Sequence, residues 1–211
     1  MTVEEYFGDW LEVIDREELA KITSWIKTQN PNTLCPAPRN IFRAFRMCSL
    51  KDCKVVMIGQ DPYPQKGVAT GVLFGNDTPK ISPSLEVVRR AAMNGETGIF
   101  DITLESWAKQ GVLMINSALT CEVDNVGCHY KQWQPFIFKL IKNISKKKPD
   151  VIFVLFGSQA QILKKVIVGQ QPILEAKHPA YFARFGRPMP PDVFIEMNEI
   201  LGENKIKLYE N

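Results

Sequence analysis

Short apolar runs alternate with helical patterns along this chain, and this alternation constrains its fold more than any other feature. The runs cover residues 55–58, 112–115 and 151–156, and residues 173–176, which include Glu175, are a plausible fourth strand. An apolar run of this length without polar interruption is typical of a strand that is buried on both faces, as in a parallel sheet. The sequence therefore predicts an α/β fold with a mostly parallel sheet that is covered by helices on both faces.

The segments between the runs carry helix and loop signals. Residues 9–28 form an apolar stripe that fits one or two helices, and residues 132–148 follow the 3.6-residue period closely. Ser82 is expected to cap a helix, and Asp101 is expected to begin another. The prolines of residues 31–42 predict a loop.

Composition limits the functional classes that fit the chain. With 211 residues, 45% of them hydrophobic, we expect one domain over residues 1–211. The net charge of +3 is too small to indicate a nucleic-acid partner by itself. Five cysteines without a CxxC pair argue against a disulfide framework or a zinc site, and favour a reducing, cytoplasmic location. We expect neither a secretory signal nor a membrane partner, because no run approaches the roughly 20 apolar residues that cross a bilayer.

Polar residues follow the expected strands. Because the carboxyl ends of parallel strands meet at one edge of a sheet, residues that are far apart in sequence are expected to share a ligand site there. These residues are Gln60, Asp61, Asn116, Gly157, Ser158 and His178.

The segment 59–64, GQDPYP, is the most informative of these strand ends. Pro62 and Pro64 fix φ on both sides of Tyr63 and so limit the motion of its ring. Taken alone, the segment is explained equally well by an ordinary Asp-Pro turn in which the Asp61 carboxylate bonds its own backbone.

Seven short motifs are spread over nearly the whole chain. They are GQDPY at 59–63, GVLF at 71–74, SPSL at 82–85, WAKQGVLMINSALT at 107–120, H-x-x-x-W at 129–133, LFGSQAQ at 155–161 and HP at 178–179. In sequence and in order they resemble the motifs of the uracil-DNA glycosylases of the first, uracil-specific class. One such motif would be weak, but seven in the same order are specific.

The resemblance implies hydrolysis of the N-glycosidic bond between uracil and deoxyribose in DNA, which leaves an abasic site, without a metal or cofactor. It implies a four-stranded parallel sheet flanked by helices. The expected partner is uracil-containing DNA, single- or double-stranded; we expect a monomer, with a proteinaceous inhibitor of the family as a possible further partner.

The resemblance also assigns catalytic roles. It gives Asp61 the task of orienting the attacking water and stabilising the positive charge that develops on the sugar. It makes His178 a hydrogen-bond donor to uracil O2, where a neutral imidazole suffices because no full proton transfer is required. His129, the second of the two histidines, is expected to be structural.

The resemblance places four further residues around the base. Asn116 can pair with both the N3–H donor and the O4 acceptor of uracil. Cytosine would leave buried groups unpaired, at a cost of about 1 to 3 kcal/mol each. Because a flip of the amide would undo this discrimination, something must hold the Asn116 side chain in one orientation. Tyr63 lies against C5 and excludes the thymine methyl. Phe74 stacks on the base, and the backbone of Gln60 contacts it.

A base inside a duplex must be extruded before it can reach such a pocket, and contacts with the DNA phosphates offset the cost of unstacking it. The resemblance assigns this to serines at helix starts and to glycine- and proline-containing loops, which in this chain are Pro36, Pro38, Ser84, Gly157 and Ser158.

The chain departs from the family pattern in two places. Pro64 replaces a histidine, and the expected wedge loop at residues 180–183 reads Ala-Tyr-Phe-Ala where the family has Ser-Pro-Leu-Ser. Our hypothesis is that Tyr181 and Phe182 form an aromatic wedge that distorts the duplex, and that Arg184 and Arg187 replace the missing phosphate contacts.

These departures leave two alternatives to an active uracil-excising enzyme. One is a DNA-binding subunit that keeps the fold for clamping or processivity, although such a subunit does not need Asp61, Asn116 and His178 together. The other is a nucleobase glycosylase of changed specificity, against which Tyr63 and Asn116 argue.

Overall fold

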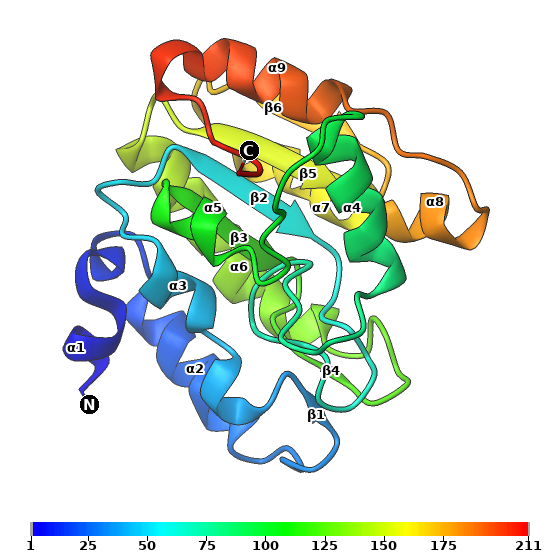
Figure 1. The fold of residues 1–211 in the computed structure, drawn as a ribbon. Coiled ribbons are helices and arrows are strands. Elements are labelled where there is room, and N and C mark those ends of the chain that lie inside the picture. Colours follow the sequence, from blue (N-terminus) through cyan, green and yellow to red (C-terminus); the bar gives the residue numbers. More distant parts are fainter. Residues whose placement is uncertain (1, 211) are drawn as a thin grey trace.

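The computed structural model describes residues 2–210 and contains a four-stranded parallel sheet at its centre (Figure 1). The strand order is β3-β2-β5-β6, and every neighbouring pair is parallel. The strands are β2 Val55–Gly59, β3 Val112–Asn116, β5 Ile152–Phe156 and β6 Ile173–Ala176. The α/β fold with a parallel sheet that the alternation predicts is therefore confirmed.

Helices cover both faces of the sheet, which is why the central strands β2 and β5 are apolar without interruption. In β2, Val56 and Ile58 pack with the core that contains residues of α2, α3 and α6, whereas Val55 and Met57 pack with the core under α4, α5 and α9. Successive side chains of a strand point to opposite faces, so each face of β2 needs its own apolar residues.

The remaining elements lie around this sheet. Among residues 2–210, no helix is long and apolar enough to cross a membrane. The helices and short strands are α1 Val3–Phe7, η1 Gly8–Glu12, α2 Arg16–Ile26, β1 Leu34–Cys35, η2 Pro38–Asn40, α3 Arg43–Met47, α4 Pro83–Met93, α5 Glu105–Lys109, β4 Cys121–Glu122, α6 Tyr130–Lys147, α7 Ser158–Gln161, η3 Ile162–Val166, α8 Pro179–Arg184, α9 Asp192–Leu201 and η4 Gly202–Asn204.

Two helix starts differ in how well the sequence predicted them. Ser82 caps α4 as expected, since its hydroxyl accepts a hydrogen bond from the Leu85 amide at 3.3 Å. The helix expected from Asp101 begins only at Glu105. The Asp101 carboxylate instead accepts hydrogen bonds from the amides of Thr103 and Ser106, and this local bonding forms a turn before the helix.

The segment after β6 is also different from its sequence interpretation. Residues 180–183, which we interpreted as a loop, lie in α8. Pro179 occupies the first turn, where its missing amide hydrogen costs no helical bond, and His178 is the N-cap. This short helix sets the position of His178 relative to the sheet.

Candidate active site

A cavity of about 750 Å³ opens at the carboxyl edge of the sheet. The segments after β2, β3 and β6 form its walls together with the loop that precedes α4. The structure thus brings together side chains from distant parts of the sequence. The predicted site residues that line the cavity are Gln60, Asp61, Tyr63, Phe74, Ser84, Asn116, His178 and Arg184.

The Asp61 carboxylate follows β2 and is held by two donors. Its Oδ1 accepts a hydrogen bond from the Gly127 amide at 3.2 Å, and its Oδ2 accepts one from the Tyr130 hydroxyl. Burial raises the pKa of Asp61, and these two hydrogen bonds oppose that rise. The alternative of an ordinary turn is wrong, because both bonds come from a segment more than 60 residues away.

Asn116 ends β3 beside Gly59, the last residue of β2. Its side chain is 8% exposed, and its Oδ1 has no hydrogen-bond partner within residues 2–210. A Cβ atom at residue 59 would lie 2.8 Å from this oxygen and 2.2 Å from Leu73 Cδ1, so only glycine fits there. A buried acceptor without a partner is costly, and a ligand that donates a hydrogen bond in the cavity would satisfy it.

The His178 ring is fixed by the helix that it caps. Its Nδ1 accepts a hydrogen bond from the Ala180 amide at 3.1 Å, so the proton of the neutral ring is on Nε2. Burial lowers the pKa of His178 to about 4, which keeps the imidazole neutral at pH 7. Gly157 lies against it, with φ of +84°, and a Cβ there would be 2.9 Å from His178 Cβ.

Tyr63 and Phe74 form an apolar side of the cavity. The Tyr63 hydroxyl donates to the Phe74 carbonyl at 3.0 Å and accepts a hydrogen bond from Ser82 Oγ at 2.6 Å. Burial raises the pKa of Tyr63 to about 12, so the hydroxyl keeps its proton. The Phe74 ring meets His178 edge-on at a centroid distance of 5.6 Å. The two aromatic rings are therefore held firmly at the cavity.

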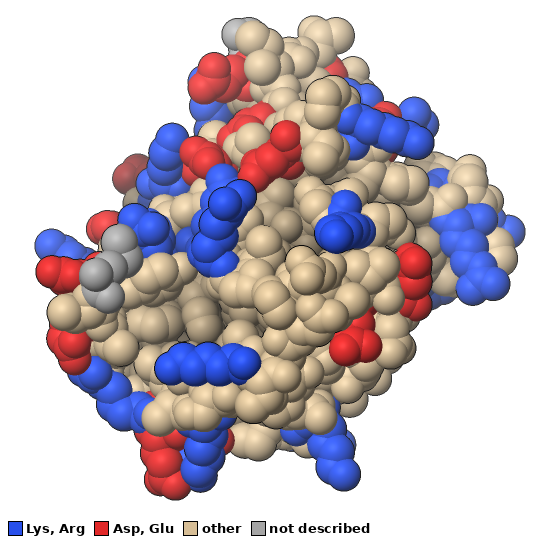
Figure 2. All heavy atoms as spheres, turned by 90° about the horizontal axis from the view of Figure 1, so that it is seen from below, with Lys and Arg blue, Asp and Glu red and all other residues tan. Residues whose placement is uncertain are grey.

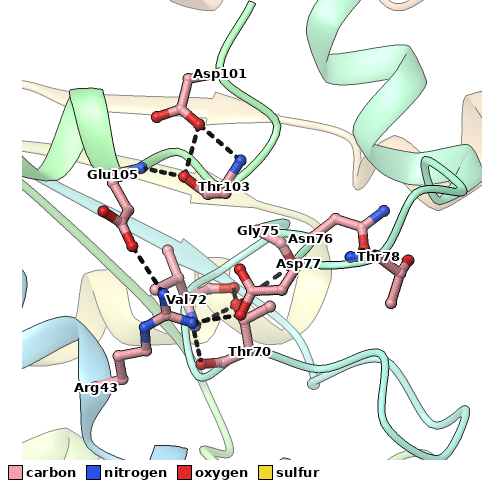
Figure 3. A network of polar contacts seen from close by, with 10 residues as sticks. All are labelled: Arg43, Thr70, Val72, Gly75, Asn76, Asp77, Thr78, Asp101, Thr103 and Glu105. Atoms are coloured by element: carbon pink, nitrogen blue, oxygen red, sulfur yellow. Dashed lines mark hydrogen bonds and ion pairs between the residues drawn. The ribbon is translucent and has the colours of Figure 1, made fainter.

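Arg43 of α3 holds the loop that carries Phe74 (Figure 3). Its guanidinium contacts Asp77 and Glu105, each at 2.8 Å, and donates to the Thr70 carbonyl at 3.4 Å. Phe74 itself has φ of +62°, a conformation that costs energy for a residue other than glycine. The polar network around Arg43 thus stabilises an unfavourable turn at the cavity wall.

The sequence profile of the Uracil DNA glycosylase superfamily matches residues 45–202. A uracil-DNA glycosylase of Campylobacter jejuni (strain 81116) is 37% identical over an alignment of 190 positions that covers 84% of this chain and 82% of that relative. The chain belongs to the uracil DNA glycosylase superfamily. A uracil-DNA glycosylase of Fusobacterium nucleatum is 33% identical over an alignment of 213 positions, gaps included, that covers 94% of each chain.

Solved structures of glycosylases share the fold of this superfamily member. A mimivirus UNG variant in complex with UGI has a TM-score of 0.74 at 22% identity, covering 99% of this chain and 93% of that one. The wild-type UNG of Nitratifractor salsuginis has a TM-score of 0.61 at 20% identity, covering 99% and 92%. These likenesses show a shared fold over 99% of this chain.

In this superfamily member, α8 presents aromatic rings and cations beside the cavity. Tyr181 is 38% exposed and Phe185 is 56% exposed, with ring centroids 5.0 Å apart. Lys177 Nζ lies 4.5 Å from the Tyr181 ring centroid, and the Arg184 guanidinium lies 6.0 Å from that of Phe185. In Figure 2, Lys and Arg side chains gather at the right-hand end, where Figure 1 has α8, and elsewhere on this face they alternate with acidic ones.

Phe182 does not belong to this exposed pair. Its ring is half-buried and packs against the core under α4 and α9. The expected wedge of Tyr181 and Phe182 therefore needs correction, because in a helix neighbouring residues point about 100° apart and only residues three or four apart share a face. Phe185, four residues after Tyr181, is the exposed ring that the sequence interpretation missed.

Among the predicted DNA contacts, Ser84 and Arg184 line the cavity and the others do not. Pro38 and Ser158 are exposed, whereas Pro36 and Gly157 are buried. His129 is buried away from the cavity, where its Nδ1 lies 2.9 Å from Thr120 Oγ1, as expected of a structural histidine. Residues 2–210 contain no cluster of three His, Cys, Asp or Glu side chains that could hold a metal ion.

Proposed function

We propose that this chain hydrolyses the N-glycosidic bond of uracil in DNA and leaves an abasic site. The observation that carries the proposal is the convergence of Asp61, Asn116 and His178 on one cavity, with the Asn116 Oδ1 buried and unpaired. The kinship with curated uracil-DNA glycosylases supports the same activity. All of these groups come from one chain, which supports a single-domain monomer over residues 1–211 as the active unit.

In the proposed mechanism, Asp61 and His178 divide the developing charges between them. The Asp61 carboxylate orients water and stabilises the cation on the sugar. The His178 Nε2–H donates to uracil O2 and stabilises the departing anion, for which its neutral state and its fixed tautomer are suitable. Neither step requires a metal or a cofactor.

Selectivity is proposed to depend on shape and hydrogen bonding. Asn116 Oδ1 accepts from uracil N3–H, and its amide donates to O4. The Tyr63 ring excludes a 5-methyl group, and its two hydroxyl bonds keep it from moving aside. Phe74 stacks on the base, and the Gln60 backbone contacts it.

The DNA strand is proposed to run over the cavity mouth and α8. Ser84 and Arg184 line the cavity and can reach the phosphates beside the uracil. Pro36, Pro38, Gly157 and Ser158 are proposed to form neighbouring phosphate contacts. The exposed rings of Tyr181 and Phe185 would stack on or wedge between bases of the opposite strand. A proteinaceous inhibitor, such as the UGI seen with the mimivirus UNG variant, would cover the same surface.

The activity can be tested with oligonucleotides that carry U opposite G, U opposite A, T opposite G, or C in place of U. Purified protein is incubated with each in the presence of a chelator, and abasic sites are cleaved with alkali. We expect scission only of the U-containing strands. DNA retention without any scission would contradict the proposal and indicate the clamp, and scission at T or C would indicate changed specificity.

The α8 surface gives a separate prediction. A double variant Tyr181→Ala and Phe185→Ala is expected to lower kcat/KM on duplex DNA by about tenfold or more, since the wedge offsets the cost of extruding a stacked base. On single strands, where little unstacking is needed, the loss is expected to be about twofold or less.

The matched control for this prediction is a double variant Ile195→Ala and Ile200→Ala, which removes exposed apolar side chains from α9. The control is expected to behave as the wild type on both substrates. Equal losses on duplex and single-stranded DNA for the α8 variant would show that these rings serve no wedge function.

A further inference from the structure

The Tyr130 hydroxyl reaches the Asp61 carboxylate from outside the cavity. Tyr130 is the first residue of α6, and its hydroxyl donates to Asp61 Oδ2. The Gly127 amide donates to Oδ1 at 3.2 Å. Asp61 lines the cavity, whereas Gly127 and Tyr130 do not. Both donors therefore hold the carboxylate from the side that faces away from the cavity. Its other side remains open to water and substrate.

The segment 124–130, which supplies these two donors, is itself held in place. Gly127 has φ of +80°, and a Cβ there would lie 3.3 Å from the Tyr130 ring, so the glycine lets the ring lie close to the chain. The Asp124 amide also donates to the Pro64 carbonyl at 3.1 Å, which ties the same segment to the loop after β2. The orientation of Asp61 thus depends on the segment between β4 and the start of α6.

Among the side chains of residues 2–210 that surround Asp61, Tyr130 is the one that donates a hydrogen bond to its carboxylate. Cys121 of β4 lies close enough to be affected by the carboxylate charge, and burial is the main reason that the pKa of its thiol is raised. Across the cavity are His178 and Tyr63, both neutral at pH 7. Burial, together with the bond to Asp61, raises the pKa of Tyr130, so its hydroxyl stays protonated and remains a donor. The neighbouring Gln60 side chain opposes this rise in the pKa of Tyr130.

We propose that Tyr130 is a positioning residue for the reaction. Its hydrogen bond holds the Asp61 carboxylate in one orientation and in the ionised form, and both are required for water attack and charge stabilisation. This inference rests on the proposed uracil excision. Two fixed donors leave a carboxylate little freedom to rotate, and a hydrogen bond donated to the ionised form also favours that form.

The test is the variant Tyr130→Phe, which removes one oxygen and keeps the ring. Single-turnover excision from a uracil-containing single strand is expected to slow by about tenfold, as for loss of one hydrogen bond to a charged group, with the Kd for DNA nearly unchanged. The control Tyr6→Phe alters a half-buried tyrosine of α1, far from the cavity, and is expected to keep the wild-type rate. Thermal unfolding of both variants checks that the fold persists.

The pH profile separates positioning from a merely structural role. The Tyr130 hydrogen bond lowers the pKa of Asp61, so its removal leaves burial less opposed and raises that pKa. The acidic limb of the rate profile is then expected to move to higher pH in Tyr130→Phe. A ¹³C NMR titration of the Asp61 carboxyl, assigned with Asp61→Asn, should move in the same direction without any activity measurement.

The outcomes distinguish this inference from the proposed function. If the wild type does not excise uracil, the proposed function fails, whatever the variant does. If the wild type is active and Tyr130→Phe keeps its rate, its acidic limb and its Asp61 titration, the inference is overturned. A slower variant with an unshifted acidic limb and an unshifted Asp61 titration would also overturn it, because Tyr130 would then support the fold alone.

Discussion

Replacing Asp61 with Asn is expected to slow uracil release by about 10²–10⁴-fold, the range that a positioned acid–base group contributes. Asn is nearly the same size but carries no negative charge, so it stabilises neither the sugar cation nor the water that attacks it. Its NH₂ group would also face either the Gly127 amide or the Tyr130 hydroxyl, both of which donate to the carboxylate in the wild type. DNA affinity is expected to change by no more than about threefold, because the phosphate contacts remain.

Single-turnover excision measures the chemical step, and fluorescence anisotropy with the same oligonucleotide measures binding. Asp150→Asn is a suitable control, since Asp150 is exposed just before β5, at the opposite edge of the sheet from the cavity. A rate for Asp61→Asn within about threefold of the wild type would exclude Asp61 from the chemistry.

Replacing Asn116 with Asp is expected to abolish the preference for uracil over cytosine. The carboxylate can accept a hydrogen bond but has no N–H to donate to O4, so uracil meets a repelling pair of oxygens in a buried site. Sites that recognise a base through paired donors and acceptors can lose about 10⁴-fold in discrimination when the pairing is wrong. We expect uracil release to fall by about 5- to 150-fold, because the penalty of one buried unpaired group is about 1–3 kcal/mol.

The uracil and cytosine oligonucleotides from the activity assay, compared by single-turnover rates, measure this ratio directly. Binding to abasic-site DNA, which lacks the base, should be unaffected and reports that the variant is folded. A variant that keeps the full uracil-to-cytosine ratio would show that Asn116 does not recognise the base edge.

The sequence predicts the edge of the sheet better than it predicts the surface around it. Asp61, Asn116 and His178 follow apolar runs, and the carboxyl ends of parallel strands meet at one edge, so their proximity follows from the strand pattern alone. The cap at Ser82 was likewise predictable, because side-chain capping is a local interaction.

Tertiary contacts decided what the sequence could not predict. Asp101 satisfies local amides instead of starting a helix, and residues 180–183 are helical where a loop was expected. Because this segment is helical, the Phe182 side chain packs against the core and the Phe185 side chain is exposed to solvent. The bond between Tyr130 and Asp61 joins residues far apart in the chain, and no local pattern indicates it.

The short helix α8 connects the outside of the molecule with the base pocket. His178 caps it at one end, and Tyr181, Arg184 and Phe185 lie within two turns of that cap. A rigid element of this length moves as one body, so a displacement caused by a strand pressing on its exposed side also displaces the imidazole ring. In the proposed complex, contact of α8 with the nucleotides that flank the uracil would therefore also change the position of the His178 ring.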